Sequence, residues 1–213
     1  MTTTIPIVKP ISQIKLAPGS SITIPNVSWQ EFESILLELG EKRAARVAYS
    51  NRTLEIMSPL PEHEIPKDLI SDIVKTLLKQ AKKRYQPFAS TTFKREGAAG
   101  VEPDACFYIQ NYQIMIGRRR LNSDDPPPDL AIETDVTSKT TLDAYEVIGV
   151  PELWVYDNGK LSIYLLTDGK YIKSDISPNF PEIQIVEIIP IIVERSWQVG
   201  SVQALEEFEA MIG

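Results

Sequence analysis

The stretch AIETDVTSK, residues 131–139, joins an apolar segment to the start of a predicted helix, and it decides the fold of the surrounding chain. Residues 129–137 (DLAIETDVT) predict a β-strand, and Thr137 and Ser138 are suitable caps for a short helix over residues 139–148. Gly149 ends that helix, and residues 152–157 return to an extended pattern. A strand, a helix and a further strand in succession indicate a βαβ unit and an α/β fold.

Carboxylates interrupt the apolar pattern of these predicted strands. Glu133 and Asp135 are two residues apart, so in a strand they project from the same face. Asp104 begins another apolar stretch, residues 102–109 (EPDACFYI). A buried carboxylate is costly without a partner, so these acids predict one of two arrangements. Either they bind a hard cation such as Mg²⁺, with Mn²⁺ as a substitute, or they lie at strand ends in water or beside Lys and Arg.

The remaining elements follow from periodicity and from turn residues. Ser28 and Glu31 have the spacing of a capping box for a helix that ends at Gly40. A long amphipathic helix is predicted from Glu62 to about Arg84. The expected strands are 21–25, a hairpin of 45–50 and 53–58, then 88–96, 102–109, 129–137, 152–157, 161–166 and 170–174, and an acidic helix is expected over 201–212. This order predicts an α/β fold with a mixed sheet.

Length, composition and charge exclude several classes of protein for this chain. A chain of 213 residues suits a single domain over 1–213, with 43% hydrophobic and 24% charged residues. The single Cys, Cys106, excludes an internal disulfide, and the sequence shows neither a membrane span nor a secretory signal, so we expect a cytoplasmic protein. The net charge of −7 argues against a protein that coats nucleic acid by bulk attraction.

A basic run qualifies this conclusion about charge. Residues 75–95 contain seven Lys or Arg and no acid. Such a run is either a solvated helix face or a patch that contacts phosphates. The candidate nucleic-acid-binding residues are Lys82, Lys83, Arg84, Lys94 and Arg95.

Four stretches together resemble a known family. EPD (102–104), PPDLAIETDVTSKT (127–140), DAYEVIGVPELWVYD (143–157) and the upstream LEIMSPLPEHE (54–64) are similar to the Uma-two family of putative restriction endonucleases, within the PD-(D/E)XK nuclease superfamily. The resemblance covers residues 47–166, with the N-terminal strand and helix and the C-terminal segment expected to pack on that core. It implies a restriction-endonuclease-like fold, which is a mixed central β-sheet flanked by helices.

The same resemblance implies roles for individual residues. Asp104 and Glu133 would bind Mg²⁺, with the backbone carbonyl of Thr134 as a third ligand. Glu64, early in the long helix, would be the accessory acid, with Glu62 as a less favoured substitute.

One position departs from the superfamily pattern. A lysine is usual two residues after the strand acid, and this chain has Asp135 there. Lys139 is then the candidate catalytic cation, and Asp135 is either a further metal ligand or the partner of Lys139. The single histidine, His63, adjoins Glu64 and is either a neighbour of the site or a surface residue at the helix entrance.

Three functions are compared. The first is a Mg²⁺-dependent endonuclease that hydrolyses phosphodiester bonds in DNA and acts as a homodimer. The second is a catalytically degenerate nuclease fold that serves as a nucleic-acid or protein-binding module, for which Asp135 in the lysine position is the main argument. The third, a glycosidase with paired carboxylates, ranks last because the sequence has no aromatic-rich platform for a sugar.

Overall fold

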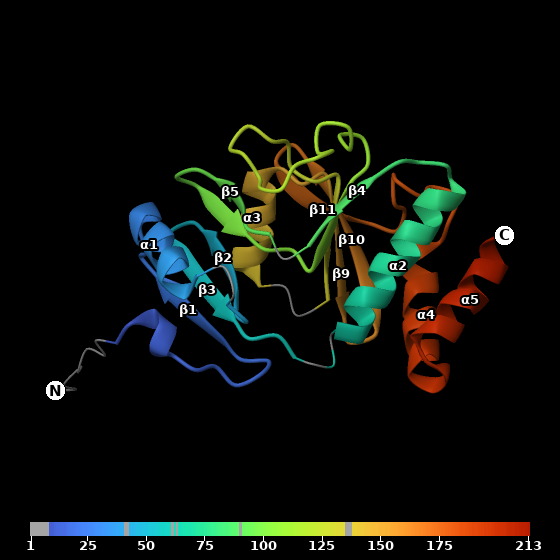
Figure 1. Cartoon of the computed structure of the whole chain (residues 1–213), viewed down its shortest axis with the longest axis horizontal. Helices are drawn as coiled ribbons and strands as arrows, with labels where there is room; N and C mark the ends of the chain where they lie inside the picture. Colours follow the sequence, from blue (N-terminus) through green and yellow to red (C-terminus); the bar gives the residue numbers. More distant parts are fainter. Residues whose placement is uncertain (1–8, 41–42, 61, 63, 90, 135–137) are drawn as a thin grey trace.

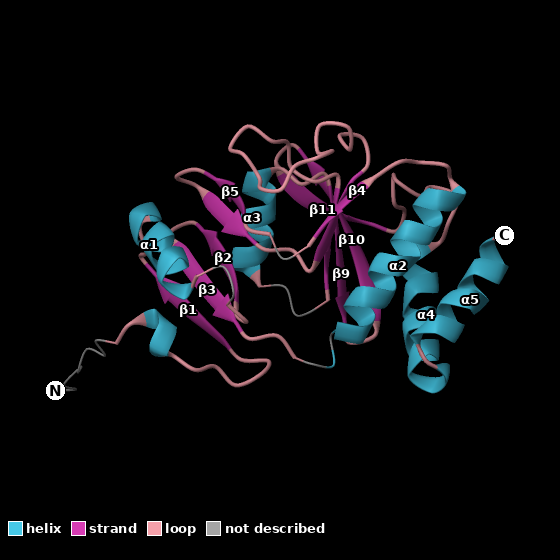
Figure 2. Cartoon of the chain, in the orientation of Figure 1, coloured by secondary structure: helices cyan, strands magenta, loops and turns pink. Residues whose placement is uncertain are grey.

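The computed structural model describes residues 9–213 apart from 41–42, 61, 63, 90 and 135–137. Its strands form two sheets, one of five strands and one of six (Figure 2). The sheets lie side by side, with helix α1 at one end of the molecule and helices α2, α4 and α5 at the other (Figure 1). The predicted α/β class is therefore confirmed.

The five-stranded sheet is antiparallel, in the order β1-β3-β2-β6-β5. Its strands are β1 (Ser21–Pro25), β2 (Arg46–Ser50), β3 (Thr53–Met57), β5 (Phe93–Arg95) and β6 (Ala99–Val101). The 3₁₀ turn η1 (Ile11–Gln13) precedes β1, and α1 (Trp29–Leu39) packs on the sheet through Phe32 and Leu36. Ser28 and Glu31 form the predicted capping box, and Asn51 and Arg52 make the turn of the predicted hairpin.

The six-stranded sheet is mixed, in the order β11-β10-β9-β8-β7-β4. Its strands are β4 (Gln86–Phe88), β7 (Ala105–Tyr108), β8 (Leu130–Glu133), β9 (Glu152–Asp157), β10 (Lys160–Thr167) and β11 (Lys170–Ser174). The predicted βαβ unit is present, because β8 and β9 are parallel and α3 (Lys139–Ile148) connects them. The other neighbouring pairs are antiparallel.

Helices cover both faces of this second sheet. On one face, α2 (Glu64–Gln80), α4 (Ile185–Val199) and α5 (Ser201–Ile212) share a core with Phe107, Ile132 and Trp154. On the other face, α3 lies between the two sheets and buries Ala144 and Tyr145 with residues of β6, β7 and β9. The alternating inward and outward side chains of β7 and β8 therefore separate two cores.

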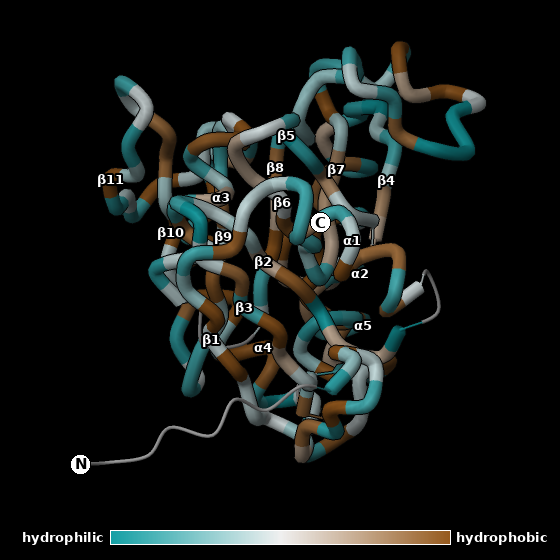
Figure 3. Tube along the Cα trace, turned by 90° about the vertical axis from the view of Figure 1, so that its left-hand side faces the viewer, coloured by the Kyte–Doolittle hydropathy of each residue, from teal (hydrophilic) through white to brown (hydrophobic). Residues whose placement is uncertain are grey.

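Three expectations about the elements were wrong. The strand predicted over 129–137 ends at Glu133, and Thr134 lies outside it. Residues 88–96 do not form one strand, because β4 belongs to the six-stranded sheet and β5 to the five-stranded sheet. The segment after Ser177 contains the unpredicted helix α4, which is hydrophobic along much of its length (Figure 3) and buries Ile189 and Val193. Pro190 obscured this helix in the sequence, although the proline lies within its first two turns.

Candidate active site

Asp104 and Glu133 are brought together at one end of the β7–β8 pair. Ala105 lies opposite Ile132 in this antiparallel pair, so the preceding Asp104 and the following Glu133 also face each other. Both are buried, with 5% of Asp104 and 6% of Glu133 exposed. Two acids that are 29 positions apart in the sequence thus form one buried carboxylate pair.

Hydrogen bonds hold both carboxylates in place. The backbone N–H and the hydroxyl of Thr134 each donate to Asp104 Oδ2 at 2.7 Å. The hydroxyl of Tyr145, on α3, donates to Glu133 Oε1 at 2.5 Å. Burial raises the pKa of Tyr145 well above its usual value, and the charges of Glu133 and Asp104 raise this pKa further. Tyr145 therefore stays protonated and acts as a donor, a role that its apolar surroundings in the sequence did not reveal.

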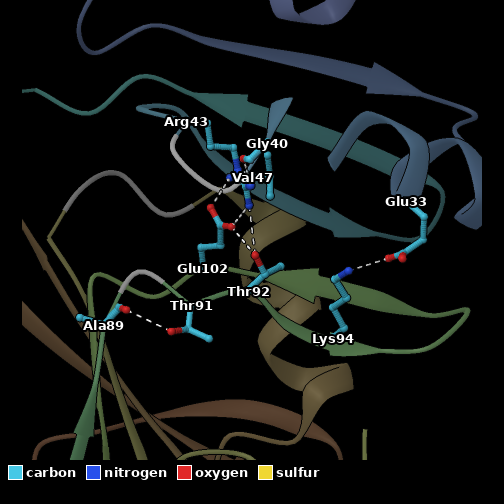
Figure 4. A network of polar contacts seen from close by, with 9 residues as sticks. All are labelled: Glu33, Gly40, Arg43, Val47, Ala89, Thr91, Thr92, Lys94 and Glu102. Carbon is cyan, nitrogen blue, oxygen red and sulfur yellow. Dashed lines mark hydrogen bonds and ion pairs between the residues drawn. The ribbon is translucent and has the colours of Figure 1, made fainter. Parts of the chain in front are cut away.

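A pair of arginines lies beside two acids of the segment 102–104. The Arg46 guanidinium forms an ion pair with Asp104, and the Arg43 guanidinium forms one with Glu102. Glu102 also accepts hydrogen bonds from the Thr92 hydroxyl and, at 3.3 Å, from the Val47 N–H (Figure 4). Neither arginine was predicted from the sequence, and the available signal was a charged residue at the start of the apolar strand 46–50.

An open cavity of about 1350 Å³ adjoins these residues. Its described lining comes from α1, β5, the first turn of α2 and the loop 119–127, and its basic members are Arg43, Arg46, Lys67, Lys94, Arg95, Arg119 and Arg120. Asp104 and Glu133 are not among the described lining residues. Arg46 connects them to the cavity, because it lines the cavity and also contacts Asp104.

One of the two predicted helix acids, Glu64, lies at the wall of this cavity. Glu64 lines it from the first turn of α2 and forms an ion pair with Lys67 at 2.9 Å. Glu62 lies in the turn before α2. His63 and Asp135 lie outside the described residues, and so does the predicted pairing of Asp135 with Lys139. Lys139 itself is the exposed first residue of α3.

The five predicted nucleic-acid-binding residues separate into two groups. Lys94 and Arg95 line the cavity, where Lys94 pairs with Glu33 and Arg95 donates to the Val147 carbonyl, each at 2.9 Å. The run 82–84 follows the other end of α2, and a helix of 17 residues is about 26 Å long. All three residues of this run are exposed, and Lys83 also donates to the Asn179 carbonyl at 2.8 Å.

A divalent metal in this site would have few protein ligands. Among the residues that the structure describes, no group of three or more His, Cys, Asp or Glu is arranged to hold a metal ion. The carboxylates of Asp104 and Glu133 are oxygen donors of the kind that Mg²⁺ prefers, and Mg²⁺ usually keeps several waters. The donor chemistry of the pair therefore fits this metal.

Comparisons with known proteins agree with the resemblance seen in the sequence. A family model, Uma2, described as "Putative restriction endonuclease", matches residues 29–198. The chain is similar to the crystal structure of a putative nuclease of DUF820 from Anabaena variabilis ATCC 29413, with a TM-score of 0.51 and 16% identity over 78% of this chain and 98% of that one. No curated protein matches the chain. No described helix is long and apolar enough to cross a membrane.

Proposed function

Because the chain belongs to the Uma2 family, described as putative restriction endonucleases, we propose that it hydrolyses phosphodiester bonds in DNA with Mg²⁺ bound at Asp104 and Glu133. The observation that carries this proposal is the buried pair of carboxylates on neighbouring strands, beside a cavity whose described lining includes seven Lys or Arg and five Asp or Glu. Paired acids at a sheet end with cations nearby suit the binding of a metal and a phosphate together.

The surrounding residues support metal binding by this pair. Thr134 orients Asp104 through two hydrogen bonds, and Tyr145 orients Glu133 through one. Hydrogen bonds of this kind orient metal-binding side chains before a metal binds. We propose the Thr134 carbonyl and Asp135 as further ligands. When bound, the metal supplies a Lewis acid that lowers the pKa of a coordinated water and neutralises charge that develops on the phosphate.

The proposed reaction is simple hydrolysis. A water oxygen forms a bond to phosphorus, one P–O bond to a neighbouring nucleotide breaks, and the departing oxygen takes up a proton. Glu64 would accept the proton of the attacking water from its position on the cavity wall, with Glu62 as a less favoured substitute and His63 as a neighbour of the site. Lys139 at the start of α3, and Lys94 and Arg95 in the cavity, would contact phosphates. Lys82, Lys83 and Arg84 would contact only a longer duplex that also reaches the far end of α2.

One observation favours the alternative of a non-catalytic binding module. The ion pair with Arg46 already compensates the charge of buried Asp104 without a metal. In that alternative the carboxylates have a structural role, and the basic residues of the cavity bind nucleic acid or an acidic protein surface. Metal affinity separates the two functions.

The test is a Mn²⁺ titration followed by electron paramagnetic resonance, together with cleavage of plasmid DNA. We expect Glu133→Gln and Asp104→Asn each to weaken Mn²⁺ binding by more than the roughly 10–100-fold cost of losing an outer-shell partner, and to abolish cleavage. In crystals soaked with Mn²⁺, anomalous density should lie between the two acids. Light scattering on the same samples tests the homodimer that we propose.

Glu152→Gln is the matched control. Glu152 is 2% exposed, and it lies opposite Leu130, at the other end of β8 from Glu133. Its carboxylate accepts from the Trp154 indole at 2.6 Å and from the Asn179 amide at 2.7 Å, and burial raises its pKa. This variant should keep both Mn²⁺ binding and cleavage. If the wild type binds Mn²⁺ no better than the Asp104→Asn/Glu133→Gln double variant, the nuclease proposal fails and the binding module is favoured.

A further inference from the structure

Arg46 lies between the buried carboxylate pair and the open cavity. It is the first residue of β2, and 14% of its side chain is exposed. Its guanidinium forms an ion pair with Asp104, while the same residue lines the cavity. A phosphate that enters from the cavity toward Asp104 and Glu133 would therefore meet this positive charge.

Arg43 and Arg46 differ in the number of polar partners that their guanidinium groups have. The Arg43 guanidinium donates to the Gly40 carbonyl at 2.7 Å and to the Thr92 hydroxyl at 3.1 Å, and it pairs with Glu102 (Figure 4). These contacts join the end of α1 to the strands and give Arg43 a structural role. Among the described residues, the guanidinium of Arg46 has one polar partner, Asp104. A guanidinium has five N–H donors, so most of those on Arg46 remain for another ligand.

Three other cations of the cavity have partners of their own. Lys67 pairs with Glu64, Lys94 pairs with Glu33, and Arg95 donates to the Val147 carbonyl. Among the described cations, Arg46 forms an ion pair with Asp104, and this contact partly balances the two buried negative charges. Its planar fork suits simultaneous contact with a carboxylate on one edge and a phosphate on the other.

We propose that Arg46 is the catalytic cation of this site, which holds Asp104 and donates its remaining N–H groups to a non-bridging oxygen of the scissile phosphate. The inference rests on the proposed nuclease function. The catalytic positive charge then comes from a residue of β2, whereas the sequence predicted Lys139 for this role. Because Arg46 and a metal would both be drawn to Asp104, the guanidinium also opposes metal binding by electrostatic repulsion.

The experiment compares Arg46→Gln, Arg46→Lys and the matched control Arg43→Gln. Each Gln variant removes one half-buried arginine and leaves one buried carboxylate without its ion-pair partner, so both should lose stability. Assays are run at a temperature at which circular dichroism shows that all variants are folded. The readouts are Mn²⁺ affinity, binding of a fluorescent DNA duplex of about 30 base pairs in Ca²⁺, and cleavage of plasmid DNA in Mn²⁺.

We expect Arg46→Gln to bind Mn²⁺ about tenfold more tightly, yet to cleave DNA about 100-fold more slowly or worse, as on loss of one charge-stabilising donor. Its affinity for the duplex in Ca²⁺ should fall. Arg46→Lys keeps the charge and should recover part of the cleavage and of the duplex affinity. Arg43→Gln should match the wild type in Mn²⁺ affinity, and its cleavage should fall far less than that of Arg46→Gln. A structural role for Arg46 would not tighten Mn²⁺ binding.

Two results would overturn the proposal for Arg46. One is cleavage by Arg46→Gln as fast as by Arg43→Gln, and the other is Mn²⁺ affinity that is unchanged or weaker in Arg46→Gln. If the wild type binds Mn²⁺ but cleaves no DNA, the nuclease function fails; tighter Mn²⁺ binding with weaker duplex binding in Arg46→Gln then still supports a phosphate contact at Arg46. A wild type that binds no Mn²⁺ removes both proposals.

Discussion

At the scale of single residues, Asp129 shows how one buried carboxylate positions the candidate site. Its Oδ2 accepts from the backbone N–H groups of Ile109, Gln110 and Asn111 at 2.6, 2.9 and 3.3 Å. Asp129 is 7% exposed and directly precedes β8, while the three donors directly follow β7. These bonds fix the two strands relative to each other, and so also fix Asp104 relative to Glu133.

Asp129→Ala should therefore destabilise the protein. Three backbone N–H groups, of which that of Ile109 is buried, lose their acceptor. Since hydrogen bonds to charged groups contribute about 1.5–3 kcal/mol each in favourable cases, we expect a loss of about 3 kcal/mol in the free energy of unfolding. Urea unfolding followed by circular dichroism measures this change.

Asp129→Asn is the control for this prediction. Its amide oxygen can occupy the position of Oδ2 and accept the same backbone donors, so the loss should be about 1 kcal/mol. An equal loss in the Asn and Ala variants would show that the negative charge of Asp129, rather than the position of the acceptor, stabilises the loop.

At the scale of elements, the packing of α1 on the five-stranded sheet depends on a close approach at β6. An ideal Cβ on Gly100 would lie 2.6 Å from Cζ and 2.8 Å from Cε1 of Phe32. Phe32 is fully buried and stacks on Tyr49, with ring centroids 4.6 Å apart. The ring has little room to move away, so a glycine is required for α1 to sit this close to the strand.

Gly100→Ala should thus destabilise the protein by about 1–3 kcal/mol through overpacking. Phe32→Leu removes the obstructing end of the ring, so the double variant should lose less stability than the sum of the two single variants. A double-mutant cycle in urea measures the coupling. Additive losses would contradict the proposed steric contact between Gly100 and Phe32.

At the scale of the whole molecule, α3 joins the two sheets. It packs with residues of β6, β7 and β9, and the hairpin β2–β3 contacts its first turns. The Ser50 hydroxyl donates to the Thr140 carbonyl at 3.1 Å, and the Asn51 amide donates to Asp143 at 2.9 Å. The helix that supplies Tyr145 to Glu133 is therefore held by the sheet that supplies Arg46 to Asp104.

Cys106 lies in the core that α3 shares with both sheets, and the pH dependence of stability tests its burial there. It lies in β7, it is fully buried, and burial raises the pKa of its thiol above the usual value. The folded protein therefore keeps the thiol protonated, whereas the unfolded chain loses the proton above about pH 8.5. Since the folded state then binds more protons, stability must fall as pH rises.

Between pH 8.5 and 10 the wild type should lose about 1.7 kcal/mol more than Cys106→Ala does over the same range, because the slope approaches about 1.4 kcal/mol per pH unit as the unfolded thiol ionises. The difference in urea unfolding free energy between the wild type and Cys106→Ala, measured at each pH, gives the effect. Equal pH dependence in the two proteins would mean that the Cys106 thiol ionises as readily in the folded protein as in the unfolded chain.

The sequence by itself determined the features that depend on neighbouring residues. The capping box of α1, the turn at Asn51 and Arg52, and the βαβ unit around Glu133 follow local patterns, and the structure has each of them. Family membership also follows from short motifs. The candidate acids Asp104 and Glu133 were recognised because a carboxylate in an apolar strand requires a partner.

The tertiary structure alone decided what depends on residues far apart in the chain. It divides residues 86–95 between two sheets, places Arg46 on Asp104, and separates Lys82, Lys83 and Arg84 from Lys94 and Arg95. Strand pairing and ion pairs of this kind are set by non-local packing, which leaves no periodic pattern in the sequence. The buried acids can therefore be recognised from local sequence, whereas non-local packing determines which cation contacts them.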